Sequence, residues 1–239
     1  MNIEYHVSVN GCDRAEGSRE NPFRTISRAA AIAETGDRVI VHEGVYREWV
    51  KPAHTGYSNI SRITYEAAEG EKVVIKGSER IQNWEQTEGT VWKAVVPNTL
   101  FGDYNPYQEI LGGDWFLYPC ADGPEGYCIH TGDVYLNGKS FFEAKSLEDV
   151  KNPVIRTEGY NPPWTKRTEP ILHPEDTVYQ WYAQVDDENT TIYANFQGAD
   201  PNRELVEINV RKCCFYPEKP GMNYITVRGF EMEQAACPW

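Results

Sequence analysis

The strongest constraint on the fold is a series of short strand-like runs with no helix between them. Strands that follow one another without helical crossovers suit a β-sandwich, a β-barrel or a coil of parallel strands. The sequence therefore predicts an all-β protein. Five runs rich in β-branched residues carry this prediction: RVIV at 38–41, RITYEA at 62–67, KVVIKG at 72–77, VEINVR at 206–211 and YITVRGFEM at 224–232.

One short amphipathic helix is expected before the first of these runs. Thr25 is a suitable N-cap and Gly36 a suitable residue after the last turn, which predicts a helix over 26–35. A coil of parallel strands has open ends, and an alanine-rich helix at the amino end can cover one of them. The helix therefore favours the coil. Its apolar face repeats at i, i+3, i+4 and i+7 in Ile26, Ala29, Ala30 and Ala33.

The segment between residues 79 and 205 differs in character and is expected to form an inserted antiparallel β-sandwich. TVYQWYAQVDDENTTIYANF at 177–196 alternates apolar and polar residues around the turn DDEN, and DVYLNGKSFFEA at 133–144 contains the hairpin turn Asn137-Gly138. We therefore expect residues 1–78 to form the helix-capped start of the coil. Residues 206–239 are expected to return to it and to leave it open at the carboxyl end. Five of the seven tryptophans lie in the insert: Trp84, Trp92, Trp115, Trp164 and Trp181.

The net charge limits the partners that the chain can attract. It has 23 basic and 36 acidic residues and a formal charge of −13. Such a field repels nucleic acid, anionic lipid and polyanionic substrates, so we expect neither a nucleic acid nor a membrane as partner, but a small or neutral molecule. No apolar run approaches the roughly 18 residues that cross a bilayer, and MNIEYHVSVNG at the start does not resemble a signal peptide. A cytoplasmic location is expected.

Cysteine spacing and short motifs give no sign of redox, metal or nucleotide chemistry. The six cysteines include no Cys-x-x-Cys pair and no metal-ligand spacing with histidine, so free thiols are expected. The Gly-x-Gly-x-x-Gly, phosphate-loop, His-Glu-x-x-His and Gly-x-Ser-x-Gly motifs are absent from the sequence. We expect no cofactor and no metal site.

An ordered set of motifs resembles a known enzyme family. YHVSVNG at 5–11 and NPFRTISRAAAIAETGDRVIVHEGVYREWVKP at 21–52 are similar to the amino end of right-handed parallel β-helix proteins of the pectin-lyase-like superfold. The remaining motifs extend the resemblance over nearly the whole chain, to family-120 glycoside hydrolases. They are RITYEAAEGEKVVIKGSERIQNWE at 62–85, FGDYNPY at 101–107, GDWF at 113–116, GDVYLNGKSF at 132–141, TTIYANFQGADPN at 190–202, VEINVRKCCFYP at 206–217 and YITVRGFEMEQAACPW at 224–239.

The resemblance implies both a fold and an activity. The family has a right-handed parallel β-helix interrupted by a β-sandwich, and its described activity is that of a β-xylosidase, which acts on xylo-oligosaccharides in xylan degradation. Retaining enzymes of this kind use two carboxyl groups roughly 5–5.5 Å apart. In the family these groups lie on later rungs of the β-helix, which would follow Trp239. No residue of this chain is therefore assigned a catalytic role, and the chain is expected to be the amino-terminal part of a longer enzyme and inactive alone.

Trp115 is the one substrate-binding residue that we predict. It follows two glycines in GGDWF at 112–116, so its indole can be presented from a loop, where a sugar ring can stack on it. The resemblance implies that the tryptophan of this motif helps to form the sugar site. The alternative is a tryptophan in the core of the sandwich. Trp164 and Trp239 have weaker claims to a ligand contact.

His42, Glu43 and Glu48 raise the question of acid–base chemistry near the amino end. On a strand that starts at Arg38, His42 and Glu43 point to opposite faces, so they do not act together. We interpret this stretch as scaffold.

Two further hypotheses remain open. The chain is either a non-catalytic carbohydrate-binding or assembly module that uses the tryptophans of the insert, or a lyase-like β-helix protein. Polyuronate substrates of lyases suit a charge of −13 poorly. An open last rung also favours association, so a homo-oligomer is a further hypothesis.

Overall fold

Strands dominate the computed structural model, which describes residues 2–112, 128–159 and 167–237. Helices in these ranges are short: α1 covers Ile26–Ala30 and α2 covers Leu147–Lys151, with 3-10 turns η1 at Asn98–Leu100 and η2 at Pro174–Val178. The chain divides into two compact units. The first unit consists of Met1–Ser78 with Arg211–Cys237, and the inserted unit is Glu79–Val210. The prediction of an all-β protein is confirmed.

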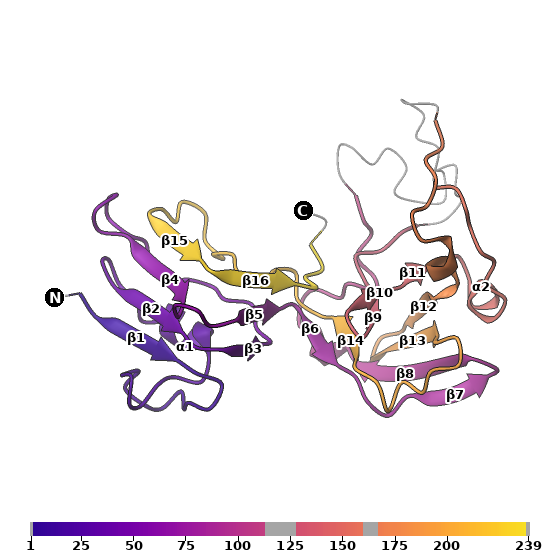
Figure 1. The fold of residues 1–239 in the computed structure, drawn as a ribbon, viewed down its shortest axis with the longest axis horizontal. Helices are drawn as coiled ribbons and strands as arrows, with labels where there is room; N and C mark the ends of the chain where they lie inside the picture. Colours follow the sequence, from indigo (N-terminus) through magenta and orange to yellow (C-terminus); the bar gives the residue numbers. More distant parts are fainter. Residues whose placement is uncertain (1, 113–127, 160–166, 238–239) are drawn as a thin grey trace. The chain divides into compact units, whose positions relative to one another are not determined.

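Two parallel sheets form the first unit (Figure 1). One has the order β1-β2-β4-β15 and the other the order β16-β5-β3, and every neighbouring pair in both is parallel. The chain passes from the first sheet to the second three times, from β2 to β3, from β4 to β5 and from β15 to β16. The bounds are β1 Glu4–Val7, β2 Arg38–Val41, β3 Gly44–Tyr46, β4 Ile63–Ala67, β5 Val73–Lys76, β15 Ile225–Arg228 and β16 Phe230–Glu233.

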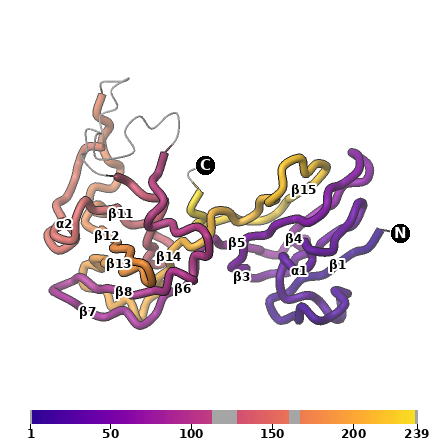
Figure 2. The backbone as a smooth tube through the Cα atoms, turned by 180° about the vertical axis from the view of Figure 1, so that it is seen from behind, coloured from indigo at the N-terminus to yellow at the C-terminus, as the bar shows by residue number. Residues whose placement is uncertain are grey.

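The last two strands extend both sheets after a long interruption of the chain. Figure 2 shows β15 beside β4, although the whole inserted unit separates them in sequence. Ile225 pairs with Ile63 and Phe230 with Val73, so each new strand repeats the register of its neighbour. Stacking of this kind places like side chains above one another and buries a continuous core.

One face of the β1-β2-β4-β15 sheet is apolar because strand side chains alternate between faces. Val39, Val41, Ile63 and Tyr65 are fully buried in one core cluster. Helix α1 adds Ile26, Ala29 and Ala30 to the same cluster. Helix α1 therefore packs against the apolar face of this sheet in the core of the first unit.

The opposite face of the same sheet has a row of alternating charges. Arg38 donates to Glu4 Oε2 at 2.8 Å and through Nε to Glu66 Oε1 at 3.0 Å, and Arg228 donates to Glu66 Oε2 from the last strand. Burial alone would raise the pKa of Glu66, but hydrogen bonds from Arg38 and Arg228 bring its pKa below the usual value. The row joins neighbouring parallel strands in their observed register.

Helix α1 is shorter than the sequence predicts. Thr25 is the N-cap, as expected, and its side chain accepts a hydrogen bond from Arg28 N. The helix ends at Ala30, however, and the prediction of a helix to residue 35 is wrong. The bonding becomes irregular after Ala30, because Ile32 N donates to Ala29 O in a tighter turn. The Asp37 carboxylate then accepts from Glu34 N and from Ile3 N, both at 2.8 Å, so residue 34 is outside helical bonding.

Two sheets also form the inserted unit. The five-stranded sheet has the order β11-β12-β13-β8-β7, with antiparallel pairs except between β11 and β12. The four-stranded sheet has the order β10-β9-β14-β6. The bounds are β6 Ser78–Arg80, β7 Glu85–Glu88, β8 Val91–Pro97, β9 Val134–Leu136, β10 Lys139–Ser140, β11 Phe142–Glu143, β12 Gln180–Val185, β13 Asn189–Asn195 and β14 Val206–Asn209.

Both predicted hairpins are confirmed. Strands β12 and β13 pair antiparallel on the two sides of Asp186–Asn189. Strands β9 and β10 pair across Asn137 and Gly138, whose φ values are 52° and 83°. Positive φ at both central residues is what a tight hairpin turn of this hand requires, and Asn-Gly adopts it at low cost.

Aromatic rings fill the core of the inserted unit. Trp181 lies edge-on to Tyr107 with ring centroids 5.3 Å apart, and Trp84 lies edge-on to Phe196 at 5.1 Å. Trp84 and Trp181 are only 3% and 2% exposed. These two tryptophans therefore support the core and are not free to stack on a sugar.

Strand β14 differs from the sequence prediction, which placed residues 206–239 together in the returning segment. Val206 pairs with Leu136 and Ile208 with Val134, so β14 belongs to a sheet of the inserted unit, and the first unit resumes only at Arg211. All four residues of β14 are buried. A strand that is buried on both faces has the same apolar sequence pattern in a parallel sheet and in an antiparallel sheet. The sequence therefore did not indicate which of the two sheets β14 would join.

Helix length bears on membrane association. Across the ranges that the structure describes, no helix is both long and apolar enough to cross a membrane.

Candidate functional site

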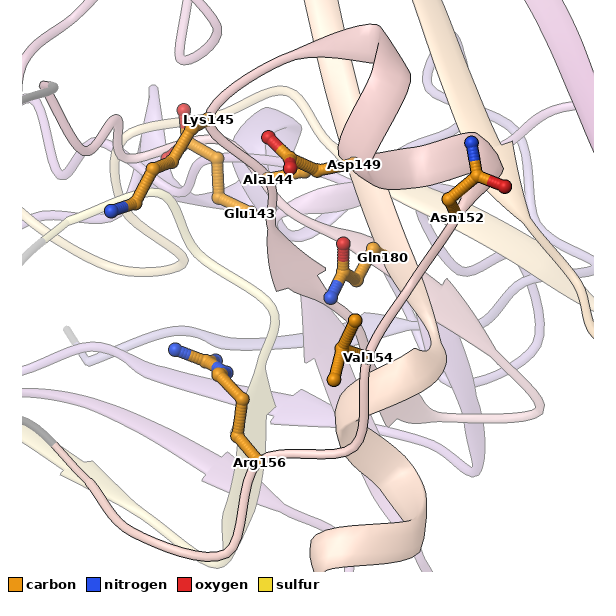
Figure 3. A pocket seen from close by; sticks show the side chains of 8 residues that line it. All are labelled: Glu143, Ala144, Lys145, Asp149, Asn152, Val154, Arg156 and Gln180. Atoms are coloured by element: carbon orange, nitrogen blue, oxygen red, sulfur yellow. The ribbon is translucent and has the colours of Figure 1, made fainter.

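A polar pocket opens in the inserted unit beside the start of β12 (Figure 3). Its volume is about 170 Å³. Strand β11 and the residues after it form one wall, helix α2 and the chain that follows it form another, and β12 contributes its first residue. The lining residues are Glu143, Ala144, Lys145, Asp149, Asn152, Val154, Arg156 and Gln180.

Gln180 is the most enclosed polar residue of this lining. It is 8% exposed, and its Nε2 donates to the carbonyl oxygen of Thr177 at 3.0 Å. That hydrogen bond fixes which end of the amide is oxygen. Oε1 is shielded from bulk water and has no hydrogen-bond partner within the described ranges. A buried carbonyl oxygen of this kind lacks a donor, which costs about 1–3 kcal/mol.

Glu143 is held by a neighbouring histidine. Its Oε2 accepts from His130 N at 2.7 Å and its Oε1 lies 2.6 Å from His130 Nδ1. The side chain is 11% exposed. Two contacts to one residue fix the carboxylate, so Glu143 forms an ordered part of the pocket wall.

Asp149 and Arg156 complete the charged part of the lining. Asp149 Oδ2 accepts from Ser146 Oγ at 2.8 Å, and Ser146 is the N-cap of α2, so the start of this short helix fixes the carboxylate. The Arg156 guanidinium lies over the ring of Phe142 at 5.3 Å from its centroid. Arg156 N donates to Thr177 Oγ1 at 2.9 Å, which ties this loop to the turn before β12.

Asp133 is a half-buried acid of the inserted unit, outside the pocket. Its Oδ1 accepts from Val134 N at 2.7 Å and its Oδ2 from Ser140 Oγ at 2.5 Å. Burial raises the pKa of this carboxyl to about 6, although these hydrogen bonds act in the opposite direction. The carboxylate bridges β9 and β10, which gives Asp133 a structural role.

The structure explains the histidine and glutamates near the amino end as scaffold. His42 Nδ1 lies 3.1 Å from Glu71 Oε1 and its Nε2 lies 3.0 Å from His6 Nδ1. Glu43 contributes its backbone N–H, which donates to Glu71 Oε2 at 2.6 Å. Glu48 accepts from Ile26 N at 2.9 Å and from Ser27 N at 2.7 Å, so it caps α1. Glu48 therefore acts at a different place from His42, and Glu43 joins the Glu71 contact through its backbone.

The predicted sugar contact, Trp115, lies outside the described residues, as do Trp164 and Trp239. The described chain brings one three-residue group into metal-binding range, with ligand atoms within 4.8 Å: His173, Glu175 and Asp176. Asp176 Oδ1 already lies 2.5 Å from Lys139 Nζ. An ammonium group therefore occupies the place of a cation, and the group forms a surface ion-pair network.

Sequence reasoning missed the Gln180 pocket. Gln180 follows a 3-10 turn and opens a strand, and Arg156 lies in a loop, so neither belongs to a motif. The one signal was the predicted hairpin around DDEN, which marks the start of its first strand without indicating a pocket.

The fold is that of a mostly β protein with an inserted unit. Comparison with known proteins identifies its family. A sequence profile described as "Glycoside hydrolase 120, insertion domain" matches residues 81–208, more than half of the chain. A second profile, a domain of unknown function named DUF1565, matches residues 9–53. The chain belongs to glycoside hydrolase family 120.

A solved structure resembles the chain over almost its full length. "The complex structure of XylC with xylose" is 58% identical in sequence, covers 99% of this chain and superposes with a TM-score of 0.92. The match covers 36% of the XylC chain, so the present chain spans about a third of that protein. A shorter match is to the uncharacterised protein YwoF of Bacillus subtilis (strain 168), which is 42% identical over 72 residues, 30% of this chain and 15% of YwoF.

Proposed function

We propose that the chain is the amino-terminal portion of a retaining glycoside hydrolase that acts as a β-xylosidase on xylo-oligosaccharides. The observation that supports this most strongly is 58% identity over 99% of the chain to XylC, whose structure contains xylose. A neutral sugar also suits a chain with a charge of −13, which repels anionic polymers. Membership of a glycoside hydrolase family favours hydrolysis over the lyase hypothesis.

The finer architecture is part of the same proposal. Three successive passages between the two parallel sheets support the first rungs of a right-handed parallel β-helix. The two sheets of the inserted unit and their shared aromatic core support a β-sandwich. We propose residues 1–78 as the capped start of the β-helix, the sandwich from residue 79, and the return to the β-helix after it.

The catalytic aspartate and glutamate are proposed to lie beyond this chain. A retaining mechanism needs them roughly 5–5.5 Å apart, one as nucleophile and one as general acid and then base. Trp115 is proposed to stack on the sugar. The cytoplasmic location, the role in xylan degradation and the homo-oligomer stay predictions.

Expression of the longer protein tests the proposal. The coding sequence past Trp239 is determined first, and the encoded protein is then incubated with xylobiose while the anomeric protons are followed by NMR. We expect β-xylose as the first product, and loss of turnover when either predicted carboxylate is replaced by its amide. The 239-residue chain serves as the inactive control. A folded long protein that cleaves no β-xyloside would contradict the proposal.

A Trp115→Ala variant of the longer protein tests the sugar contact. Loss of one stacking aromatic is expected to lower kcat/KM by roughly tenfold, which corresponds to about 1.4 kcal/mol. An unchanged kcat/KM would assign Trp115 to structure.

A non-catalytic carbohydrate-binding or assembly module is the second hypothesis. The pocket at Gln180 favours it, because this pocket lies in the family's insertion domain and is lined by hydrogen-bonding groups. A stop codon directly after Trp239 would favour this second hypothesis over the hydrolase.

A further inference from the structure

The pocket at Gln180 contains one polar atom that the protein leaves unsatisfied. Gln180 Oε1 is buried, and across the described residues it accepts no hydrogen bond. Buried polar groups are nearly always hydrogen-bonded, so each exception calls for an explanation such as a missing partner. Figure 3 shows the amide between Asp149 and Val154, in the middle of the lining residues. A hydroxyl group in the pocket would supply the missing donor.

Arg156 supplies donors on the other side of the same pocket. Its side chain stacks over Phe142, and within the described part of the chain no hydrogen bond from the guanidinium to a protein acceptor is found. In Figure 3 the guanidinium lies on the same side of Val154 as Lys145 and Glu143. Gln180 therefore offers an acceptor and Arg156 offers donors, and a hydroxyl group can satisfy both because it donates one hydrogen bond and accepts others.

The charges of the lining do not favour an ion. Glu143 and Asp149 balance Lys145 and Arg156, so the formal charge of the lining is zero. The two carboxylates also have partners already, His130 and Ser146. The most enclosed group, Gln180, is neutral, and an ion placed against it would lose water without meeting an opposite charge. A neutral ligand is therefore favoured.

The size of the pocket limits the ligand further. Its 170 Å³ lies below the roughly 300–1,000 Å³ of pockets for drug-sized ligands. Val154 adds an apolar wall beside the polar groups. The occupant is thus small, rich in hydroxyl groups and partly apolar, which describes a single sugar ring with its C–H face.

From these contacts we infer that the pocket at Gln180 binds one neutral sugar ring, with a hydroxyl group donating to Gln180 Oε1 and another accepting from Arg156. This site lies within the inserted unit and is made by residues of this chain alone. Its occupancy can be measured without hydrolysis, because the test follows binding alone.

Titration of the purified 239-residue chain with D-xylose tests the inference. Saturation-transfer NMR detects binding and calorimetry gives Kd, with glycine as a zwitterionic comparison of similar polarity. We expect saturable xylose binding in the millimolar range, because a ligand of about ten non-hydrogen atoms offers few contacts. Absence of saturable binding, or binding of glycine that xylose does not displace, overturns the inference.

Two variants assign any binding to this pocket. Arg156→Gln changes an exposed side chain and is expected to fold, and loss of its charged donors should raise Kd roughly tenfold. Gln180→Met removes the acceptor and should also raise Kd roughly tenfold. Arg203→Gln is the matched control, because Arg203 is an exposed arginine of the same unit that does not line the pocket.

The outcomes separate this site from other sugar contacts of the chain. Xylose binding that Arg156→Gln leaves unchanged comes from another surface and overturns the inference, even if Gln180→Met fails to fold. The titration follows binding and not hydrolysis, so failure of the proposed function, which is absence of turnover in the longer protein, is a distinct result.

Discussion

The first unit and the inserted unit bury apolar surface in different ways. The first unit stacks parallel strands whose inward side chains are mostly valine and isoleucine, and α1 adds three small or aliphatic residues. The inserted unit packs aromatic rings edge to face between mostly antiparallel strands. A stacked core repeats the same contact at each strand, whereas a core of large rings has a different contact at each position.

The pocket at Gln180 lies in the unit with the less regular core. In the first unit, the charged row on the β1-β2-β4-β15 sheet is closed by its own ion pairs. The inserted unit has longer connections, and one of them, which includes Arg156, passes over the start of β12 and leaves Gln180 partly enclosed. Functional side chains are commonly placed on such loops.

The largest effect is expected from Trp181→Ala, which removes a ring from the aromatic core. Trp181 is 2% exposed and contacts Tyr107 edge-on. Truncation of a buried tryptophan costs about 3–5 kcal/mol. Hydrogen exchange followed by mass spectrometry should show lost protection in peptides of the inserted unit but not in strands β2 and β4. Trp92→Ala, at a half-buried position of the same core, is the milder control. Equal loss of protection in both units would show that they unfold together.

The sequence predicted the elements of both units better than it predicted their partners. Runs such as RVIV and RITYEA became strands β2 and β4, since β-branched residues between turns signal strands. The same kind of run at 206–209 became β14, but β14 pairs with β9 of the inserted unit. The partner of a strand depends on packing against residues distant in sequence, which the run itself does not encode. The pocket could not be predicted, since Arg156 and Gln180 come to line one pocket only after the chain between them, which includes η2, has folded.

Asp133 couples the stability of the inserted unit to pH, because desolvation of its half-buried carboxyl raises the pKa of that group to about 6. The folded protein then holds this proton more tightly than the unfolded chain does. Its stabilising contribution is full below a pH of roughly 4 and is lost as the pH rises through about 6. Asp133→Asn abolishes this dependence, and an amide can still accept from Val134 N while it donates to Ser140 Oγ.

Urea denaturation between pH 4 and pH 7 measures this effect. The variant should gain about 2 kcal/mol relative to the natural chain over this range. Asp103→Asn, an exposed acid of the same unit, should give no such gain. A pH-independent difference between the Asp133 variant and the natural chain would contradict the raised pKa.

Glu48→Ala tests the junction between helix and strands in the first unit. The carboxylate accepts from Ile26 N and Ser27 N, two amides that have no partner within α1. Their loss should cost about 1–2 kcal/mol. Thermal unfolding measures this loss of stability, with Glu43→Ala as the control. Glu43 is an exposed glutamate five residues earlier, and it contributes its backbone N–H to the local contacts. Equal stability of the two variants would mean that Glu48 does not cap α1.

The smallest expected effect comes from a matched pair of tyrosines in the first unit. Tyr65 is fully buried, and its hydroxyl has no hydrogen-bond partner among the described residues. Burial raises the pKa of Tyr65 above its usual value, so this hydroxyl stays neutral. Tyr65→Phe removes an unsatisfied polar group and should leave the stability unchanged or raise it by about 1 kcal/mol.

Tyr46→Phe should act in the opposite direction. Tyr46 is also buried, but its hydroxyl donates to the carbonyl oxygen of His42 at 2.8 Å. Removal of the donor should cost about 1 kcal/mol, the net value of a typical hydrogen bond. The same change at two buried tyrosines therefore gives free energies of unfolding of opposite sign if Tyr65 lacks a partner in solution. A loss of stability in both variants would mean that the Tyr65 hydroxyl meets a water molecule or another acceptor, and that the stacked core is less dry than its aliphatic side chains imply.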